Sequence, residues 1–330
     1  MATDDTATAF WLARPGRAEL RREELPARGA GEVLVETLFT GISRGTETLV
    51  FAGRVPDSQR DAMRCPFQAG EFPGPVKYGY CSVGRVLEGP DGLAGRAVFC
   101  LHPHQDRYVV PVSAVTTLPD ALPPGRAVMA ANMETALNAV WDAAIRPGDR
   151  VCVIGLGVVG LLAARLAARV AGAEVLALDL DPAKRVPAEA LGLAFAEAPP
   201  AGADFDMVLH ASGHPDGLVT ALGIAGFEAT VLEMSWYGST PVTLPLGEAF
   251  HSRRLTIRSS QVGSVATAQR SRWSHARRMA KALELLCDPA LDALVDGESR
   301  FADLPETMAA LAEGRLAALC HRVRFPAAEG

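Results

Sequence analysis

A glycine-rich turn at residues 155–160 is the feature that most constrains the fold of this chain. The stretch VCVIGLGVVGLLAARLAARVAGAEVLALDLD places Gly155, Gly157 and Gly160 between an apolar, strand-like run and a segment with helical periodicity. The first glycine permits a tight turn, the second lets a bound group approach the backbone, and the third lets helix and strand pack closely. The start of the helix offers free N–H groups and a positive dipole end. The pattern therefore predicts a strand-turn-helix unit that binds a pyrophosphate.

The chain around this unit continues to alternate between strands and helices. A helix is expected at residues 161–171. Strands are expected at residues 151–154, 175–179, 205–211, 230–234 and 255–260. Such alternation is typical of a parallel sheet covered on both faces, so we expect a doubly wound α/β domain of the Rossmann type.

An acidic residue follows the second strand of the unit. Asp179 comes nineteen residues after Gly160, where its carboxylate would accept hydrogen bonds from both hydroxyls of a ribose. Its charge would repel a 2′-phosphate, so the pattern favours NAD(H) over NADP(H). Lys184 and Arg185 follow closely and leave this preference open, because they belong either to the nucleotide site or to a solvated helix face.

The residues before the turn have a different pattern. Residues 31–119 contain short β-rich runs such as EVLVETLFTGI and DRYVVPV, separated by glycine and proline, and they predict a mainly β domain. Residues 124–144 are expected to form a helix that leads into the next domain. The final run ALCHRVRF is expected to be a strand that pairs back into the first domain. The expected domains are a β-rich domain of residues 1–126 completed by residues 265–330, and a Rossmann domain of residues 127–264.

The composition excludes several functional classes. The chain has 330 residues, of which 49% are hydrophobic, which is enough for the cores of two domains. A net charge of −6 without any dense Lys/Arg cluster argues against a nucleic-acid partner. No signal sequence or apolar run of membrane-spanning length is seen, so we expect a cytoplasmic protein without a membrane partner. The six cysteines are scattered without metal-site spacing, which predicts reduced thiols. Since the charge balance suggests no nucleic acid, the expected partner is a small molecule.

The order of these features resembles the medium-chain dehydrogenase/reductase superfamily over nearly the whole chain. TGISRGTE (40–47) is similar to the family segment that presents the first catalytic zinc ligand, and GYCSVGRV (79–86) is similar to its GHE-type segment. The resemblance implies a GroES-like β-rich catalytic domain joined to the Rossmann domain. The runs SRGTE, METALNAVWD and SSQVG are also similar to a narrower zinc-free subgroup that includes the bacteriochlorophyllide hydroxyethyl dehydrogenase.

The zinc ligands of the family are missing at the corresponding positions. Ser43 stands at the thiolate position, Tyr80 at the histidine position and Cys81 at the position of the following glutamate, while Ala131 falls where a third ligand is expected. Zinc binds thiolate, imidazole or carboxylate groups, and this set retains a single thiol. The four-cysteine structural zinc lobe is absent as well. The resemblance therefore implies a zinc-free member.

The family's contacts with its nicotinamide cofactor correspond to further residues of this chain. They are Arg44 for the pyrophosphate, Thr135 and Val159 for the nicotinamide, Ala211 and Ser212 for the adenine, and the backbone of Ser235 for the carboxamide. The complete expected set is Arg44, Thr135, Gly155, Gly157, Val158, Val159, Gly160, Asp179, Lys184, Ala211, Ser212 and Ser235.

Tyr80 is the first candidate to replace the missing Lewis acid. A phenol, with an ordinary pKa near 10, can donate a hydrogen bond or a proton to a substrate oxygen that gains charge. Ser43 is expected to serve as a second donor or a relay, and Lys77 or the oxidised nicotinamide ring to assist Tyr80. The alternative is that Tyr80 is a wall residue that only packs.

Other polar residues have two interpretations each. His102 and His104 could form a proton relay or a metal site. The alternative is that both lie on an exposed loop, and we favour this alternative because the segment contains proline. Glu47 orients Arg44 or caps a turn. Residues 51–75 form a lid or a substrate wall, and residues 235–246 form a homodimer interface or cover the nicotinamide.

The expected function is the NAD(H)-dependent interconversion of a secondary alcohol and a carbonyl on a small molecule, in a cleft between the domains. Two alternatives remain open at this point. One is an NAD(P)H-dependent reductase of an activated C=C bond in an enone or quinone. The other is a dinucleotide-binding sensor without turnover.

Overall fold

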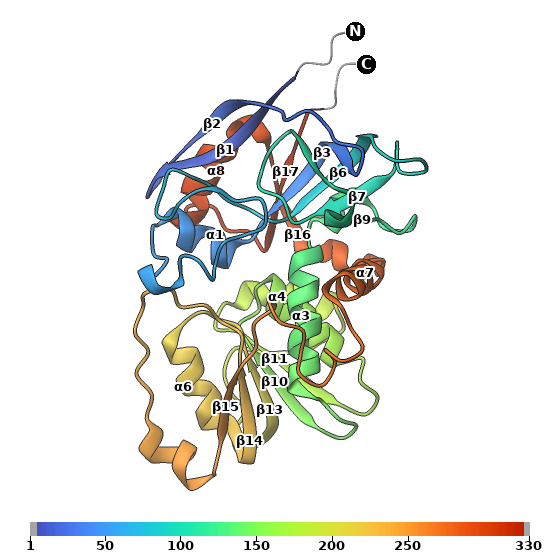
Figure 1. The fold of residues 1–330 in the computed structure, drawn as a ribbon. Coiled ribbons are helices and arrows are strands. Elements are labelled where there is room, and N and C mark those ends of the chain that lie inside the picture. The colour runs from blue at the N-terminus through green and yellow to red at the C-terminus, as the bar shows by residue number, and fades with distance from the viewer. Residues whose placement is uncertain (1–4, 327–330) are drawn as a thin grey trace. The chain divides into compact units, whose positions relative to one another are not determined.

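The chain divides into two compact units in the computed structural model, which describes residues 5–326 (Figure 1). The first unit holds the described residues up to Ala131, together with Leu283–Pro289 and the described residues from Val295 onward. The second unit holds Asn132–Ala282 and Ala290–Leu294. Among the described residues, no helix combines the length and the apolar character needed to span a membrane.

The first unit is built from two sheets. The smaller sheet has the order β2-β1-β5-β4, and the larger follows β16-β17-β3-β6-β7-β9 with β8 paired to β3 (Figure 1). The strands of the smaller sheet are β1 (Thr6–Arg14), β2 (Arg17–Glu24), β4 (Ala69–Gly70) and β5 (Val76–Lys77). Those of the larger sheet are β3 (Glu32–Ile42), β6 (Ser82–Glu88), β7 (Ala97–Cys100), β8 (Arg107–Pro111), β9 (Val115–Thr117), β16 (Val295–Arg300) and β17 (Cys320–Arg324).

The core of the larger sheet follows from the alternation of apolar residues in its strands. Val33 and Val35 on β3 are fully buried and pack with Val86, Val98 and Val110 of neighbouring strands. Two helices of this unit, α1 (Arg44–Phe51) and α8 (Leu304–Ala312), pack against each other. Because α1 begins directly after β3, the buried strand fixes where the segment 43–47 lies.

The last strand confirms the expected return of the chain to the first unit. β17 pairs antiparallel with β3, and Val323 lies opposite Thr40. The β1–β2 hairpin and β16 were not expected from the sequence, because β2 (RAELRREE) and β16 (VDGESR) lack apolar runs.

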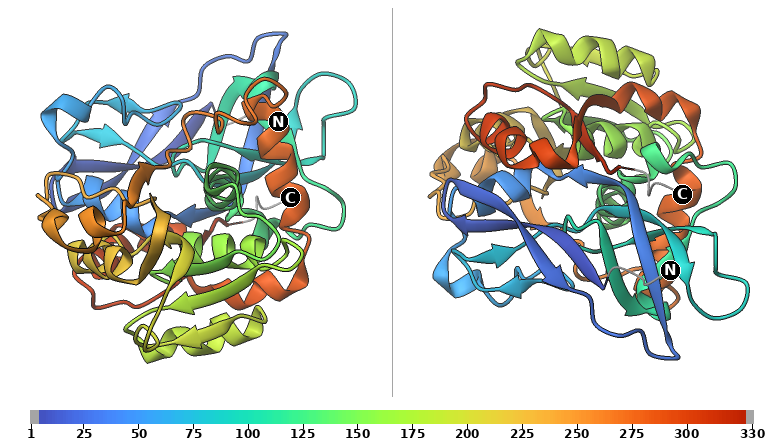
Figure 2. Two further views of the ribbon diagram at one scale, coloured as in Figure 1. Left: turned by 90° about the horizontal axis from the view of Figure 1, so that it is seen from below. Right: turned by 90° about the horizontal axis from the view of Figure 1, so that it is seen from above.

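The second unit contains a six-stranded parallel sheet with the order β12-β11-β10-β13-β14-β15. Its strands are β10 (Arg150–Ile154), β11 (Glu174–Leu178), β12 (Ala194–Ala196), β13 (Phe205–His210), β14 (Ala225–Glu233) and β15 (Thr256–Ser259). Its helices are α3 (Ala130–Ala143), α4 (Val158–Ala167), α5 (Arg185–Ala190), α6 (Pro215–Ile224) and α7 (His275–Leu285), which pack around the strands (Figure 2). The strand order reverses at β10, as in a Rossmann fold, and confirms the expected fold class.

The boundaries between the units differ from the expected ones. Residues 265–282 belong to the second unit, not to the first. The reason lies in α7, where the buried Arg278 donates from Nε to Glu134 Oε1 (3.0 Å) and from Nη1 to Asn138 Oδ1 (2.6 Å), both on α3. A buried guanidinium requires such partners, and they bind α7 to the second unit.

Two connecting segments also differ from their expected form. Residues 124–144 form two helices, α2 (Pro124–Ala127) and then α3, where a single helix was expected. Residues 51–75 contain a short 3₁₀ turn at Asp57–Gln59 and the strand β4. The role of residues 51–75 as a lid or substrate wall stays a prediction.

Candidate active site

The glycine turn lies between β10 and α4, as predicted. Gly155 has a φ of +91°, and a Cβ at this residue would clash with the backbone of Ser212. A Cβ at Gly160 would clash with the carbonyl oxygen of Gly155. At Gly157, the residue that precedes α4, a Cβ would meet nothing within 4 Å. The turn itself therefore requires glycine at positions 155 and 160. Only Gly157 leaves open space over the start of the helix.

Asp179 is joined to the same turn by hydrogen bonds. Its Oδ2 accepts from the Leu156 N–H at 2.7 Å, and its Oδ1 accepts from the Asp181 N–H at 2.9 Å. The carboxylate thus lies beside the glycine turn, where the sequence pattern predicted an acid for the ribose hydroxyls. Lys184, in the 3₁₀ turn Pro182–Lys184, pairs with Asp181 at 3.6 Å.

Arg185 pairs with carboxylates of its own neighbourhood. Its Nη2 lies 3.0 Å from Glu197 Oε1, and its Nη1 lies 3.7 Å from Glu189 Oε1. Lys184 and Arg185, the two basic residues that follow Asp179, are therefore both paired with carboxylates. Neither is left unpaired to bind a 2′-phosphate.

The carboxyl ends of β13 and β14 complete this edge of the sheet. Ala211 and Ser212 follow β13 and pack on Gly155, and the Ala211 N–H donates to the Ile154 carbonyl at 2.8 Å. Ser235 follows β14, and its Oγ accepts from the Gly213 N–H at 3.1 Å. The structure therefore brings the glycine turn, Asp179, Ala211, Ser212 and Ser235 to one edge of the sheet. Val158 and Val159 begin α4, and Thr135 lies on α3.

The remaining candidates belong to the first unit. Ser43 directly precedes α1, and Tyr80 and Cys81 directly precede β6. The two segments meet closely, because a Cβ at Gly41 would lie 3.4 Å from the Cβ of Cys81. Ala131 is buried near the start of α3. Arg44, expected at a pyrophosphate, donates from Nη1 to the Ala318 carbonyl of its own unit at 3.1 Å.

The side chains of Ser43 and Thr46 lie close enough to the Tyr80 hydroxyl to lower its pKa slightly. Burial outweighs them and raises the pKa of Tyr80 well above its usual value, and the neighbouring Cys81 and Glu47 raise it further. The phenol therefore keeps its proton at neutral pH and acts as a donor. A phenol with this pKa is poorly suited to the role of a base.

Lys77, suggested by the sequence as a helper of Tyr80, has polar partners of its own. Its ammonium is buried and lies 2.7 Å from Glu23 Oε2 on β2 and 2.8 Å from Gln105 Oε1. Its assistance to Tyr80 stays a prediction.

The side chains around Tyr80 do not fit a zinc ion. Zinc requires deprotonated thiolate, imidazole or carboxylate ligands. Burial raises the pKa of the Cys81 thiol well above its usual value, and Glu47 and Cys320 raise it further, which disfavours the thiolate that zinc would need. Within residues 5–326, no three His, Cys, Asp or Glu side chains lie close enough together to hold a metal ion.

A buried carboxylate-imidazole pair supports this cluster and was not assigned from the sequence. Glu47 Oε2 lies 2.8 Å from His104 Nε2, and the two side chains are 3% and 1% exposed. Glu47 Oε1 accepts from the Ser43 N–H at 2.7 Å, so Glu47 caps the start of α1, which was one of its two expected roles. His104 Nδ1 lies 2.6 Å from Thr40 Oγ1. Glu47, held by His104, therefore fixes the backbone of Ser43 through this hydrogen bond.

The same imidazole also supports the segment of Tyr80. Gly79 has a φ of +136°, and a Cβ there would lie 2.9 Å from His104 Cδ2. The exposed positions favoured for His102 and His104 are wrong, since both side chains are buried between β7 and β8. The apolar runs FCL and YVV on either side of the histidines are the signal that could have predicted their burial.

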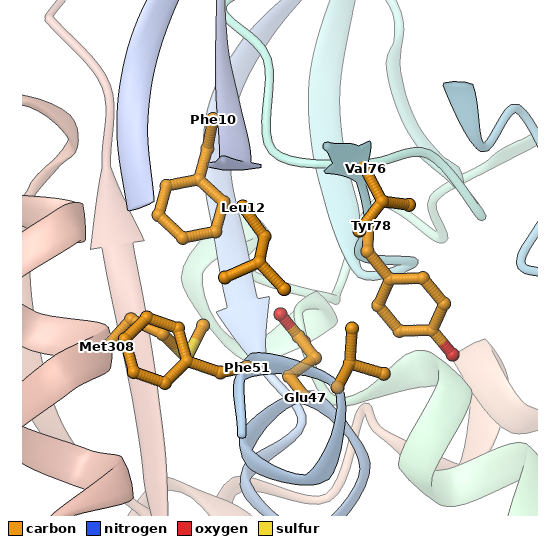
Figure 3. Close-up of a pocket in the computed structure, with 8 residues that line it drawn as sticks. Phe10, Leu12, Glu47, Phe51, Val76, Tyr78 and Met308 are labelled. Carbon is orange, nitrogen blue, oxygen red and sulfur yellow. The ribbon is translucent and has the colours of Figure 1, made fainter. Parts of the chain in front are cut away.

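A cavity next to Glu47 is too small to be a substrate site. It has a volume of about 10 Å³, room for roughly one water molecule (Figure 3). Phe10, Leu12, Phe51 and Met308 form most of its apolar wall, and Glu47 and Tyr78 face it. Substrate binding within this cavity is therefore excluded.

Three kinds of comparison connect this geometry with known proteins. The family model for the C-terminal domain of alanine dehydrogenase/PNT matches residues 130–234, the part that carries the glycine turn. D-guloside 3-dehydrogenase of Escherichia coli (strain K12) is 25% identical over 312 residues, which cover 84% of this chain and 88% of that protein. The 2-desacetyl-2-hydroxyethyl bacteriochlorophyllide A dehydrogenase of Rhodobacter capsulatus is 28% identical over 253 residues, or 67% and 71% of the two chains.

The fold agrees with that of a solved reductase. Acetophenone reductase from Geotrichum candidum, solved in complex with NAD, superimposes with a TM-score of 0.76 at 18% identity, over 98% of each chain. Its fold matches both units of this chain in the same order. In its β-rich unit, in its parallel sheet with the glycine turn, and in these relatives, the chain is similar to the medium-chain dehydrogenase/reductase superfamily and has its fold.

Proposed function

We propose that the protein is an NAD(H)-dependent oxidoreductase that interconverts a secondary alcohol and a carbonyl and works without zinc. The observation that carries this proposal is the Tyr80 phenol, which stays protonated beside Ser43 and Thr46. By the sequence resemblance, Tyr80 and Ser43 stand at positions where the family has metal ligands. Support also comes from the glycine turn with Asp179 and from the two relatives, whose names describe them as dehydrogenases.

The chemistry assigned to this chain is the stabilisation of charge on the substrate oxygen. When bound, the nicotinamide supplies a hydride in reduction or accepts one in oxidation. We infer that the Tyr80 O–H donates a hydrogen bond and then its proton to the substrate oxygen, and that Ser43 and Thr46 donate to the phenolate that is left. Because its pKa is raised, Tyr80 suits carbonyl reduction better than alcohol oxidation at neutral pH.

The preference for NAD(H) over NADP(H) is part of the proposal. It is supported by the carboxylate of Asp179 beside the glycine turn and by the pairing of Lys184 with Asp181. A 2′-phosphate would meet negative charge that no neighbouring cation balances. We also propose that the protein acts on a small molecule as a homodimer, for which the edge strand β15 supplies an unpaired side.

A Tyr80→Phe variant tests the proton donor. With a panel of secondary alcohols and ketones and both cofactors, the wild type should use NAD(H) and should keep its activity after exhaustive chelation. Tyr80→Phe should lower kcat by about 10²-fold or more while leaving the KM for NADH unchanged, since only the donor to the substrate is lost. Tyr78→Phe is the matched control, because that hydroxyl makes one long contact, 3.4 Å, with the Met63 carbonyl.

Four results would contradict the proposal in different ways. Full turnover by Tyr80→Phe would remove the phenol from catalysis. Stoichiometric zinc in active enzyme, with activity lost on its removal, would overturn the metal-free mechanism. Reduction of enones without any reaction of alcohols or ketones would replace the proposed activity with C=C reduction, and tight NAD(H) binding without hydride transfer would replace it with a sensor.

A further inference from the structure

A polar cluster occupies the carboxyl ends of β13 and β14, and Glu233 is at its centre. Glu233 Oε2 lies 2.7 Å from His210 Nδ1 and accepts from the Tyr237 hydroxyl at 3.0 Å. Glu233 Oε1 accepts from the Ser235 N–H at 2.7 Å. One carboxylate therefore holds the end of the neighbouring strand and both ends of the segment 235–237.

The cluster extends to the glycine turn through His210. His210 is fully buried, and its Nε2 lies 2.6 Å from Ser212 Oγ. Because Glu233 can only accept, His210 Nδ1–H donates to it, and in a neutral ring Nε2 then accepts from the Ser212 hydroxyl. The backbone of Ser212 packs directly on Gly155. Hydrogen bonds and packing thus connect Glu233 continuously with the turn.

The carboxylate of Glu233 is held in its charged form. Burial favours its neutral form, but the interactions with His210 and Ser235 outweigh burial and lower the pKa of Glu233 below its usual value. A charged acceptor makes stronger hydrogen bonds than a neutral one. The segment 235–237 is therefore held by a carboxylate under neutral conditions.

The position of the cluster in the sheet relates it to one half of a dinucleotide. A pyrophosphate at the start of α4 and an adenosine ribose at Asp179 place the adenosine half at the end of β11. β13 and β14 lie on the opposite side of β10 from β11. The other half of the dinucleotide, which carries the nicotinamide, then extends over the ends of β13 and β14, where the Glu233 cluster lies.

We propose that Glu233 is a positioning residue for the nicotinamide half of the cofactor, acting through the segment 235–237. This inference rests on the proposed function, because it requires that a nicotinamide dinucleotide binds at the glycine turn. Glu233 orders the segment before the cofactor arrives, so that binding does not have to order it. It has no role in holding the adenosine half, which depends on the glycine turn and Asp179.

Binding of NAD⁺ and of ADP-ribose to the full-length protein separates the two halves. ADP-ribose carries the pyrophosphate and adenosine but lacks the nicotinamide. By calorimetry, Glu233→Gln should weaken NAD⁺ binding by about tenfold, while ADP-ribose binding stays within about twofold of the wild type. Tyr237→Phe removes one of the hydrogen bonds to Glu233 and should weaken NAD⁺ binding in the same selective way but less.

Glu228→Gln is the matched control. Glu228 is also on β14, but it is exposed and pairs with Arg254 at 2.9 Å, outside the cluster. Its substitution should change neither affinity. A purely structural role for Glu233 would weaken both ligands alike, and that result would overturn the inference.

The two proposals fail in distinguishable ways. A wild-type protein that binds neither NAD⁺ nor ADP-ribose would overturn the proposed function and this inference together. Normal binding by the wild type, with an unchanged ratio of the two dissociation constants in Glu233→Gln, would overturn this inference alone. Should Glu233→Gln fail to fold, an unchanged ratio in Tyr237→Phe would do the same.

Discussion

His102 shows how burial decides the charge of a single side chain. Its ring stacks on that of Tyr108 with centroids 3.8 Å apart, and its Nδ1 lies 2.9 Å from the Pro103 carbonyl, to which Nδ1–H donates. Burial lowers the pKa of His102 to about 3, and the positive charges of Lys77 and His104 act in the same direction. The hydrogen bond to Pro103 opposes this shift only in part. The imidazole is therefore neutral over the whole range in which an exposed histidine titrates.

The stability of the protein should consequently fall in mild acid. The pKa of His102 is about 3 in the folded protein and about 6.5 in the unfolded chain. Below pH 6.5 the unfolded chain therefore binds a proton that the folded protein does not, and the free energy of unfolding falls as the pH drops toward 3. The loss is up to about 1.4 kcal/mol per pH unit, or about 2 kcal/mol between pH 6.5 and 5.0. Urea unfolding of the wild type and of His102→Phe at pH 7.0 and 5.0 measures it, and equal pH dependence in the two proteins would refute it.

At the scale of an element, the start of α4 separates glycines needed by the fold from a glycine needed by a ligand. Gly160 has the carbonyl of Gly155 at the place of a Cβ, whereas Gly157 has open space there. Nothing in the described protein explains glycine at position 157. A pyrophosphate on the N–H groups of the helix would explain it, because a methyl group would prevent its close approach.

Alanine substitutions should give opposite results at these two positions. Gly157→Ala should change the free energy of unfolding by less than about 1 kcal/mol, yet weaken NAD⁺ binding by more than about tenfold. Gly160→Ala should cost about 2–4 kcal/mol of stability through the overlap with Gly155. Thermal unfolding and calorimetric binding of both variants check this. Undiminished NAD⁺ affinity in Gly157→Ala would contradict a pyrophosphate at this turn.

The elements that could be predicted from the sequence are those with a local signal. β10 (RVCVI) and β13 (FDMVLH) are mostly apolar runs bounded by turns, because strands of a parallel sheet are buried on both faces. β2 and β16 carry mostly polar residues, and only their partners in the sheet define them as strands. The single helix expected at residues 124–144 failed for a similar reason, since no glycine or proline marks the break between α2 and α3.

The candidate site divides in the same way. The glycine turn and Asp179 could be predicted because their spacing follows from the chemistry of one local unit. Glu47 and His104 are 57 residues apart, and no pattern along the chain indicates that β3, α1 and the segment before β8 bring them together. The same limit applies to Lys77, whose partners Glu23 and Gln105 are 54 and 28 residues away.

At the scale of the whole molecule, the two units have separate cores and hold different parts of the proposed machinery. The glycine turn, Asp179 and the Glu233 cluster belong to the second unit, whereas Ser43 and Tyr80 belong to the first. A ligand that binds only the folded state stabilises the unit that holds it, by about 2.7 kcal/mol at a concentration of 100 times its Kd.

Hydrogen exchange should reveal this division. Saturating NAD⁺ should slow exchange of the slowest amides in β10, β13 and β14 by about 100-fold, following that stabilisation. Amides in the core of the first unit, such as those of Val33, Val35 and Val110, serve as the internal reference. Protection that appears in β3 and β8 but not in β10 would assign the dinucleotide to the wrong unit and contradict the proposal.

The close packing of His104 on Gly79 has a consequence for how this protein can change over evolution. Any residue other than glycine at position 79 displaces the imidazole, and loss of the imidazole leaves the Oε2 of the buried Glu47 without its hydrogen-bond partner His104. Replacing Gly79, His104 or Glu47 alone should thus lower stability, whereas replacing all three together avoids the clash and the unpaired carboxylate. In descendants of a common ancestor, these positions should therefore be inherited or exchanged as a set.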